Sequence, residues 1–255
     1  MEEFRFLDLE TKTAYMNMAV DESIMLAVGG GFAPPTLRFY RWKPSAVSIG
    51  TFQGMSEEVD LDYCRRQGID YIRRITGGGA VYHDYEGEIT YSIILPKGHR
   101  LAPDDILESY RVLCGGVVKA LEQLGIEAEF KPINDVIAGG KKVSGNAQTR
   151  RHSCLLQHGT ILLDLDVETM FSVLKVPQEK ISDKMIADVK ERVTSIRELL
   201  GRDVAFQELG AALEVGFGKA LAVKIVHGIM TSNELQTAER IVDERYSRNE
   251  WNLKR

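Results

Sequence analysis

The chain has 255 residues, 44% hydrophobic and 27% charged, so it is long enough to bury a sizeable core and too apolar to be disordered. A formal net charge of -5, without any long run of Lys or Arg, argues against a protein built mainly to bind nucleic acid. Its three widely spaced cysteines form no CxxC pair and predict neither a disulfide framework nor a zinc knuckle. An acidic N-terminus and the lack of any apolar stretch near the roughly 20 residues of a membrane span predict a soluble, cytoplasmic protein.

The first hundred residues are predicted to alternate between strands and helices. Predicted strands cover residues 4–9, 36–42, 46–52, 71–75 and 88–95, and predicted helices cover residues 16–28 and 60–69. Glycines stop both helices, at residues 29–31 and at Gly68.

The clearest helix follows at residues 104–125, with Asp104 expected as its N-cap and Gly125 as its terminator. Strand-like runs then cover residues 126–130, 136–145 and 153–165, and Gly139-Gly140 marks a tight hairpin. After about residue 167 the pattern is mostly helical, including residues 205–221 and 234–246. The sequence therefore predicts an α+β fold, in which helices flank one or more mainly antiparallel sheets, as a single catalytic domain spanning residues 1–255.

Three consecutive glycines, Gly77 to Gly79, interrupt the segment RRITGGGAVYHD at residues 73–84. Glycines let another molecule approach the main chain, and successive exposed N–H groups can bind an anion, although a flexible hairpin tip is the alternative. Arg73 and Arg74 precede the loop on successive strand positions, so they point to opposite faces and one of them can enter a pocket. Thr76 adds a hydroxyl at the loop entrance. Neither GxxxxGK[ST] nor GxGxxG is present, so a generic P-loop or Rossmann site is not predicted.

A second cluster lies in NDVIAGGKKVSGNAQTR at residues 134–150. Strand alternation places Lys141 and Lys142 on opposite sides, and the plain alternative is a charged edge strand protected from aggregation. Lys142 is followed by Val143, Ser144 and Gly145, which are small and leave room for a ligand. An inward Lys142 would be able to hold a carboxylate and a phosphate together.

Three potential metal ligands share one face of a predicted strand: His152, Cys154 and His158. A strand rises about 3.3 Å per residue, which puts residues 152 and 158 roughly 20 Å apart. Zinc ligands lie near 2 Å from the ion, so no zinc site is predicted here.

Together, RRITGGGAVYHD, Asn134-Asp135, GKKVSGNA and HGTILLDLD resemble the lipoate-protein ligase A family, within the biotin and lipoate ligase superfamily. The likeness extends in the family's order from about residue 4 to residue 252. It implies the family's catalytic-domain fold and an ATP- and Mg²⁺-dependent activation of lipoate to lipoyl-AMP. Transfer to a lysine of a lipoyl-domain protein would follow, either a dehydrogenase E2 subunit or a glycine-cleavage H protein.

By this resemblance, Lys142 matches the family's essential catalytic lysine, and residues 73–80 match the loop that binds the lipoyl-adenylate. A fixed donor that stabilises transition-state charge is typically worth about 3–4 kcal/mol. Arg74 is expected to contact the phosphate or carbonyl, and Asp135 to bind Mg²⁺. The full set expected to bind the nucleotide and acyl group is Arg73, Arg74, Thr76, Gly77, Gly78, Gly79, Ala80, Tyr82, His83, Asn134, Asp135, Ser144, Gly145, Ala147 and His158.

The main alternative is a cysteine-dependent octanoyl or lipoyl transferase of the same superfamily, which takes its acyl group from acyl carrier protein or another lipoyl protein without ATP. Such relatives carry the cysteine shortly before the GKK segment, and residues 127–140 contain none. The sequence therefore favours the ligase. A non-enzymatic binding module would not need Lys142, and a biotin ligase would carry GRGR where this chain has RRITGGG.

Many lipoate ligases continue beyond the EWN region at residues 250–252 with a small accessory domain, whereas this sequence stops at Arg255. The resemblance to split archaeal ligases leads to the expectation that this C-terminal domain is absent and that a small separate accessory subunit is needed. The sequence does not distinguish lipoate from octanoate as the substrate.

Overall fold

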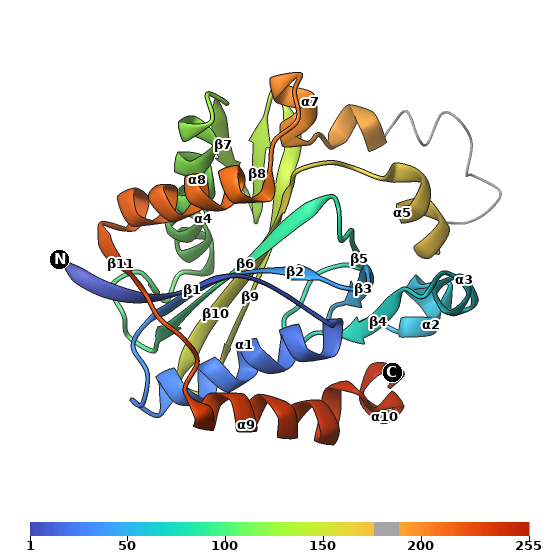
Figure 1. Ribbon diagram of the computed structural model, residues 1–255, viewed down its shortest axis with the longest axis horizontal. Helices are drawn as coiled ribbons and strands as arrows, with labels where there is room; N and C mark the ends of the chain where they lie inside the picture. Colours follow the sequence, from blue (N-terminus) through green and yellow to red (C-terminus); the bar gives the residue numbers. More distant parts are fainter. Residues whose placement is uncertain (176–188, 255) are drawn as a thin grey trace.

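The computed structural model describes residues 1–175 and 189–254, and an eight-stranded sheet runs through it (Figure 1). The strand order is β11 (Val223–His227), β1 (Glu2–Lys12), β2 (Thr36–Trp42), β6 (Glu88–Pro96), β10 (Cys154–Leu162), β9 (Lys141–Arg151), β8 (Asp135–Ala138) and β7 (Ala128–Lys131). β1 runs parallel to β11 and β2, and the other neighbours in this sheet are antiparallel. The predicted mainly antiparallel α+β fold is thus confirmed. β11 was not predicted: it is a short edge strand in which only Val223 is fully buried.

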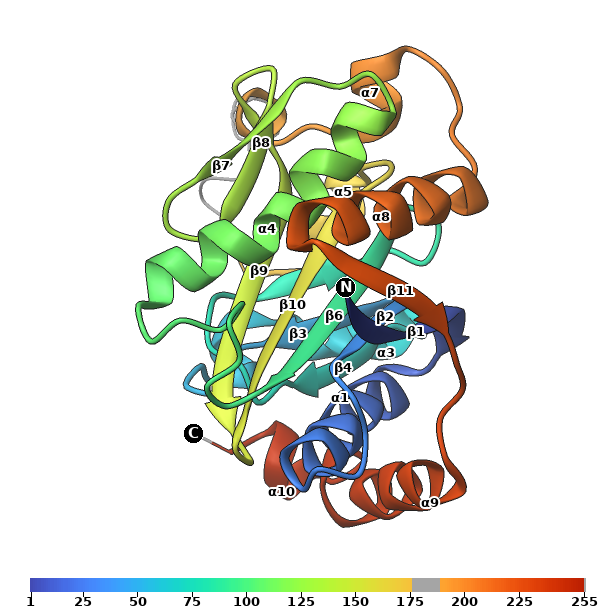
Figure 2. The ribbon, with the colours of Figure 1, turned by 90° about the vertical axis from the view of Figure 1, so that its left-hand side faces the viewer.

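Two layers of helices cover the sheet (Figure 2). On one face, α4 (Ile106–Gln123) and α8 (Phe206–Leu221) pack against each other and share one hydrophobic core with the sheet. On the other face, α1 (Ala14–Gly29) lies against β6 and β10, and α9 (Ser232–Ile241) packs on α1. Most of the site described below lies on this second face.

The sequence of β6 explains why polar side chains are buried there. Its residues alternate, and Ile89, Tyr91 and Ile93 belong to the core shared with α4 and α8. The residues between them, including Glu88, Thr90 and Ser92, therefore face the α1 side, where all are at most 3% exposed. Buried polar groups need hydrogen-bond partners, so this row of β6 requires polar residues from other elements to meet it.

A three-stranded sheet lies beside the large one, in the order β4 (Asp70–Arg73), β3 (Ala46–Ile49), β5 (Val81–His83). Three short helices accompany it: α2 (Met55–Glu58), α3 (Leu61–Gln67) and α5 (Val167–Val173). The glycine loop joins β4 to β5. The predicted strand at 46–52 ends early, at Ile49, because the main chain of Gly50 meets this loop: a Cβ on Gly50 would lie 2.1 Å from the carbonyl oxygen of Gly78.

Most predicted helix and turn signals are confirmed. Gly68 ends α3 with φ +67°, and Gly139 and Gly140 form the β8–β9 hairpin with φ +56° and +78°. The N-cap of α4 is Asp105 rather than the expected Asp104, because the Asp105 side chain accepts a hydrogen bond from Glu108 N at 2.8 Å. Gly125 follows the end of α4 with φ +81°.

Apart from β11, the C-terminal part is mostly helical where described, and it includes the short helices α7 (Ile196–Leu200) and α10 (Asn249–Asn252). The predicted helix at 234–246 divides into α9 and a π-helical segment, Val242–Tyr246. Part of the helical prediction after residue 167 falls on residues 176–188, outside the described residues. In the part of the chain that is described, no helix is both long and apolar enough to cross a membrane.

Candidate active site

A cavity of about 330 Å³ lies between the glycine loop, β5, β6, β9 and β10. This volume is within the range of small-molecule sites. Apolar side chains form much of its wall: Met18, Trp42, Leu162, Met170, Leu174 and Val193. Polar groups converge at one side, from the glycine loop, from β9 and from buried histidines. The cavity is therefore suited to a ligand with a short apolar chain and one polar, reactive end.

Arg74 lines the cavity and holds the glycine loop in place. Its Nε donates to Thr76 Oγ1 at 3.1 Å, and Nη1 donates to both the carbonyl and the Oγ of Ser48 at 3.1 Å. Nη2 donates to the carbonyls of Gly77 and Gly79, both at 2.8 Å. Burial lowers the pKa of Arg74 to about 10, so the guanidinium stays charged at neutral pH. Because these donors are already engaged, Arg74 shapes the loop rather than offering a free contact to a phosphate.

The glycine loop keeps its backbone N–H groups available. Gly78 has φ +97°, and an added side chain at Gly77 or Gly79 would meet open space. Among the hydrogen bonds between described residues, none uses the N–H of Gly77, Gly78 or Gly79 as a donor. Gly78 and Gly79 line the cavity, so this strip of main chain can donate to an oxygen of a bound ligand.

Arg73 faces the other way, as strand alternation predicted. Its guanidinium donates to the carbonyls of Thr51 at 3.1 Å and Trp251 at 3.0 Å, and its N–H donates to Asn252 Oδ1 at 3.0 Å. Arg73 is fully buried and is absent from the residues described as lining the cavity. It joins the C-terminal helix α10 and the loop after β3 to β4, in place of the expected ligand contact.

Lys142 lines the cavity from β9, and its side chain is 40% exposed. Its Nζ lies 2.7 Å from Asp135 Oδ1 on β8, whereas Lys141 points away and pairs with Glu198 at 3.3 Å. The register of β8 and β9 shifts beside Lys142, as in a β-bulge, which re-aims side chains. A Cβ on Gly145 would lie 2.8 Å from Lys142 Nζ, so this glycine makes room for the lysine itself.

Asn134 and Asn146 fix the neighbouring wall by reciprocal hydrogen bonds. The N–H and Nδ2 of Asn146 donate to the carbonyl of Asn134, at 3.0 and 2.9 Å, and Nδ2 of Asn134 donates to the carbonyl of Asn146. Gly159 allows this arrangement, because a Cβ there would lie 2.0 Å from Asn146 Oδ1. Ser144 lies fully buried beside Asn146 and outside the cavity wall.

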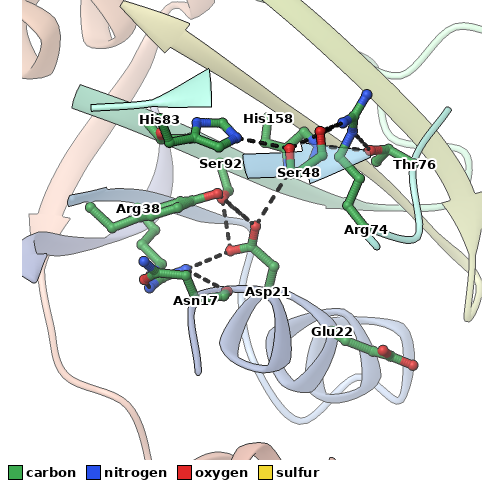
Figure 3. A network of polar contacts seen from close by, with 12 residues as sticks. Asn17, Asp21, Glu22, Arg38, Ser48, Arg74, Thr76, His83, Ser92 and His158 are labelled. Atoms are coloured by element: carbon green, nitrogen blue, oxygen red, sulfur yellow. Dashed lines mark hydrogen bonds and ion pairs between the residues drawn. The ribbon is translucent and has the colours of Figure 1, made fainter. Parts of the chain in front are cut away.

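His158 and Asp21 form one buried pair beside the cavity (Figure 3). His158 Nε2 lies 2.8 Å from Thr76 Oγ1, and its Nδ1 lies 3.6 Å from Asp21 Oδ2 of α1. Burial lowers the pKa of His158 despite this carboxylate. Burial would raise the pKa of Asp21, but the nearby His158 and the charge of Arg38 more than offset it and lower that pKa.

His83 and Ser48 form a second buried contact, also visible in Figure 3. His83 Nε2 lies 2.8 Å from Ser48 Oγ, and its Nδ1 lies 2.7 Å from Glu88 Oε1. The ring of Trp42 stacks on His83 with centroids 4.0 Å apart. The alternation of polar and apolar residues in β6 could have indicated that Glu88 belongs to the site. Ser48 lies between apolar residues of β3, so no sequence pattern singled it out.

Two expectations from the sequence concern Asp135 as a Mg²⁺ ligand and a cysteine as the nucleophile of the alternative transferase. The described residues bring together no group of three His, Cys, Asp or Glu side chains that could hold a metal ion, and Asp135 is engaged by Lys142 outside the cavity wall. The Mg²⁺ contact expected of Asp135 therefore stays a prediction from the resemblance. Burial raises the pKa of Cys64 and Cys154 to about 11 and that of Cys114 to about 12, and none of the three lines the described cavity.

The structure gathers most of the expected site residues around one cavity. Those that line it are Arg74, Gly78, Gly79, Ala80, Tyr82, His83, Asn134, Lys142, Gly145, Ala147 and His158. The expected residues outside its described lining are Arg73, Thr76, Gly77, Asp135 and Ser144. Further lining residues were not predicted from the sequence: Met18, Trp42, Ser48, Glu88, Thr90 and Asn146.

Known proteins resemble this chain over its whole length. Residues 13–218 match the family described as the lipoyl protein ligase A/B catalytic domain. The octanoyltransferase LipM of Brevibacillus brevis is 36% identical and that of Kyrpidia tusciae 38% identical, each covering 100% of both chains. A solved bi-partite lipoate protein ligase from Thermoplasma acidophilum is 37% identical with a TM-score of 0.89, covering 99% of this chain and 97% of the other.

These comparisons correct the reaction expected from the sequence. The curated relatives that match from end to end are octanoyltransferases, so the prediction of an ATP-dependent lipoate ligase is wrong, and the acyl-transferase alternative is the better supported. The fold and the family expectation are confirmed by the matched residues and the solved relative. The chain is an enzyme of the lipoate ligase superfamily and belongs to the lipoyl protein ligase A/B catalytic domain family.

Proposed function

We propose that the chain transfers an octanoyl group to a lysine of a lipoyl-domain protein. The observation that carries this proposal is the match to octanoyltransferases over the whole of both chains. The cavity supports it, because its apolar wall suits an eight-carbon chain and its polar side offers a lysine and open backbone amides.

The arrangement suits the chemistry of acyl transfer. Attack on an acyl carbonyl places negative charge on its oxygen, and preorganised donors stabilise that charge most when they are fixed beforehand. The N–H groups of Gly78 and Gly79 and the ammonium of Lys142 are the donors we assign to this oxygen. Arg74 keeps the loop in shape through its bonds to Gly77 and Gly79.

The acyl donor in this proposal is an octanoyl thioester, carried by acyl carrier protein or by another lipoyl protein. The acceptor is a lipoyl domain of a dehydrogenase E2 subunit or of a glycine-cleavage H protein. We treat residues 1–255 as a single catalytic domain. The expected small accessory subunit is not part of this proposal. The proposal rests on octanoyltransferase relatives that match over the whole of both chains.

Neither ATP nor Mg²⁺ has a role in this proposal. Within the described residues, the guanidinium of Arg74 donates hydrogen bonds to the glycine loop, and Asp135 forms an ion pair with Lys142. The ligand in this proposal is a lipoate-related acyl group. Three further residues expected to contact the ligand, Tyr82, Asn134 and Ala147, line the cavity that would hold it.

The test is transfer in a purified system. The chain is incubated with octanoyl-acyl carrier protein and an unmodified lipoyl domain, without ATP. The mass of the lipoyl domain is then measured by mass spectrometry. We expect one octanoyl group on its acceptor lysine, and none on a matched domain whose acceptor lysine is replaced by arginine. Modification that appears only with free octanoate and Mg²⁺-ATP would overturn the proposal.

A further inference from the structure

We propose that Ser48 is the nucleophile that accepts the acyl group in this site, activated by His83 and Glu88. This inference rests on the proposed acyl transfer and adds the group that carries the acyl chain between donor and acceptor. A transferase that works through a covalent intermediate needs a nucleophile in its cavity. None of the three cysteines lines the described cavity, whereas Ser48, His83 and Glu88 all do.

The three side chains form one continuous hydrogen-bonded chain. Ser48 Oγ lies 2.8 Å from His83 Nε2, and His83 Nδ1 lies 2.7 Å from Glu88 Oε1. A carboxylate only accepts hydrogen bonds, so the Nδ1 that faces Glu88 carries the proton. In the neutral imidazole, Nε2 is then the acceptor and the Ser48 hydroxyl donates to it. This is the order of groups found in serine nucleophiles activated by a histidine and an acid.

The strands bring these residues together from separate parts of the chain. β3 and β5 are antiparallel neighbours in which Ala46 pairs with His83, so Ser48, two residues along, presents its side chain on the same face. Glu88 belongs to the buried polar row of β6. All three residues are at most 5% exposed, and all three line the cavity.

Arg74 places a positive charge beside the serine oxygen. Its Nη1 donates to Ser48 Oγ at 3.1 Å, which stabilises the negative charge that develops when the hydroxyl loses its proton. The same guanidinium fixes the carbonyls of Gly77 and Gly79 through Nη2. The N–H groups of the glycine loop are therefore held on the wall that includes Ser48, where they can receive the oxygen of an acyl carbonyl.

Further contacts fix the orientation of the histidine and the acid. The Trp42 ring stacks on His83 with an interplanar angle of 17°. Trp42 Nε1 donates to Thr90 Oγ1 at 2.7 Å, and Thr90 Oγ1 donates to Glu88 Oε1 at 2.8 Å. Such supporting bonds lower the freedom of catalytic side chains before substrate arrives.

A second hydroxyl–histidine–carboxylate arrangement exists at Thr76, His158 and Asp21, and it is less suited to this role. Thr76 is fully buried and absent from the described cavity wall. The distance from His158 Nδ1 to Asp21 is 3.6 Å, and Asp21 also accepts hydrogen bonds from Arg38 and Ser92. This arrangement ties α1 to the sheet.

The proposed steps balance without an added oxidant or reductant. Ser48 Oγ attacks the carbonyl carbon of the octanoyl thioester while its proton passes to His83 Nε2. The carbon–sulfur bond breaks and the departing sulfur takes that proton, which leaves an octanoyl ester on Ser48 and a free thiol. The amine of the acceptor lysine then attacks the ester, and its proton returns through His83 to Ser48 Oγ as the carbon–oxygen bond breaks.

The direct test is to trap the ester. The wild-type chain is incubated with octanoyl-acyl carrier protein without an acceptor domain and then digested with a protease. The masses of its peptides are measured by mass spectrometry. We expect one octanoyl group on the peptide that contains Ser48, stable to neutral hydroxylamine as an oxygen ester is. An octanoyl group on Cys64, Cys114 or Cys154, or octanoyl transfer to the acceptor without any adduct on Ser48, would overturn the assignment.

Variants give an independent readout. Ser48→Ala should lower the transfer rate by about 10²-fold or more, and the double variant Ser48→Ala/His83→Gln should be little worse than either single one, because residues that act as a unit are not additive. Ser48→Cys should retain an adduct, now sensitive to neutral hydroxylamine. Ser109→Ala is the matched control, since Ser109 is an equally buried, hydrogen-bonded serine outside the cavity wall.

The outcomes separate the two proposals. A wild-type chain that transfers nothing from octanoyl-acyl carrier protein removes the proposed function and this inference with it. A wild-type chain that transfers normally, with full activity in Ser48→Ala, leaves the function in place and removes only the serine nucleophile. Unfolding curves show whether a loss in Ser48→Ala reflects stability, and the adduct on the wild-type chain needs no variant at all.

Discussion

The ammonium of Lys142 lies 2.7 Å from the carboxylate of Asp135, on adjacent strands of the β8–β9 hairpin at the cavity wall. Asp135 balances the charge of Lys142 and holds it in position, while the lysine side chain stays 40% exposed. The pair therefore leaves a positive charge at the cavity wall, where it is partly open to solvent.

Replacing Lys142 by alanine should lower octanoyl transfer by about 10² to 10³-fold, the usual effect of losing one fixed donor to a developing oxyanion. Asp135→Asn should cost less than about tenfold, because the lysine remains and only its positioning partner changes. Initial rates at saturating lipoyl domain measure both effects. A Lys142→Ala chain with near-normal rate would contradict the role given to this residue.

Gly50→Ala should disturb the glycine loop, because the added Cβ would lie 2.1 Å from the carbonyl oxygen of Gly78. We expect lower transfer activity and a loss of about 1–3 kcal/mol in the free energy of unfolding, as is common for overpacked sites. Transfer rates and urea unfolding measure these. Gly210→Ala is the matched control: its Cβ meets open space within α8, so activity should stay unchanged and stability should rise by about 0.5–1 kcal/mol.

Arg73→Lys should loosen the C-terminal helix. The guanidinium donates to main-chain carbonyls of Gln53, Trp251 and Asn252, a set that the three donors of one ammonium cannot all reach. We expect a loss of about 1–3 kcal/mol of stability and faster protease cleavage near residue 251. The exposed Arg65, paired with Asp62, offers a matched change: Arg65→Lys should alter stability by less than about 0.5 kcal/mol. Equal effects of the two substitutions would refute the anchoring role.

His158 should make the folded chain less stable in mild acid. The pKa of His158 in the folded chain lies below the ordinary value of 6.5. As pH falls through 6.5, His158 therefore becomes protonated in the unfolded chain before it does in the folded chain. Stability attributable to His158 is therefore full above this pH and declines below it. Asp21, with a pKa below its ordinary value of 3.8, adds a second loss only at lower pH, as its folded form is finally protonated.

Urea unfolding at several pH values between about 7 and 5 measures this dependence, around the ordinary histidine pKa. His158→Gln should flatten the decline. His227→Gln should steepen it, because the hydrogen bond to Asp8 raises the pKa of His227 and its contribution is therefore present at low pH and lost as pH rises. Identical pH slopes in the wild-type chain and His158→Gln would exclude the assigned role of this histidine.

Features that depend on local rules could be predicted from the sequence. Strand alternation separated Arg73 from Arg74 and Lys141 from Lys142, and the structure confirms that each pair points to opposite sides. Glycine positions predicted the end of α3 and the β8–β9 hairpin, because these sites require positive φ angles that other residues adopt poorly. The motifs also identified the family, and through it the cavity-lining loop and Lys142.

The contacts between distant residues depend on how the chain packs and could not be predicted from the sequence. Asp21 reaches His158 from α1, and Glu88 and Ser48 reach His83 from two different sheets, contacts that no local period encodes. Arg73 bonds to Trp251, 178 positions away in the chain, so its role as an anchor was invisible beside the motif that suggested a ligand contact. Buried polar groups must find partners wherever the fold brings them, and those partners are set by how sheets and helices pack rather than by the residues next to them in sequence.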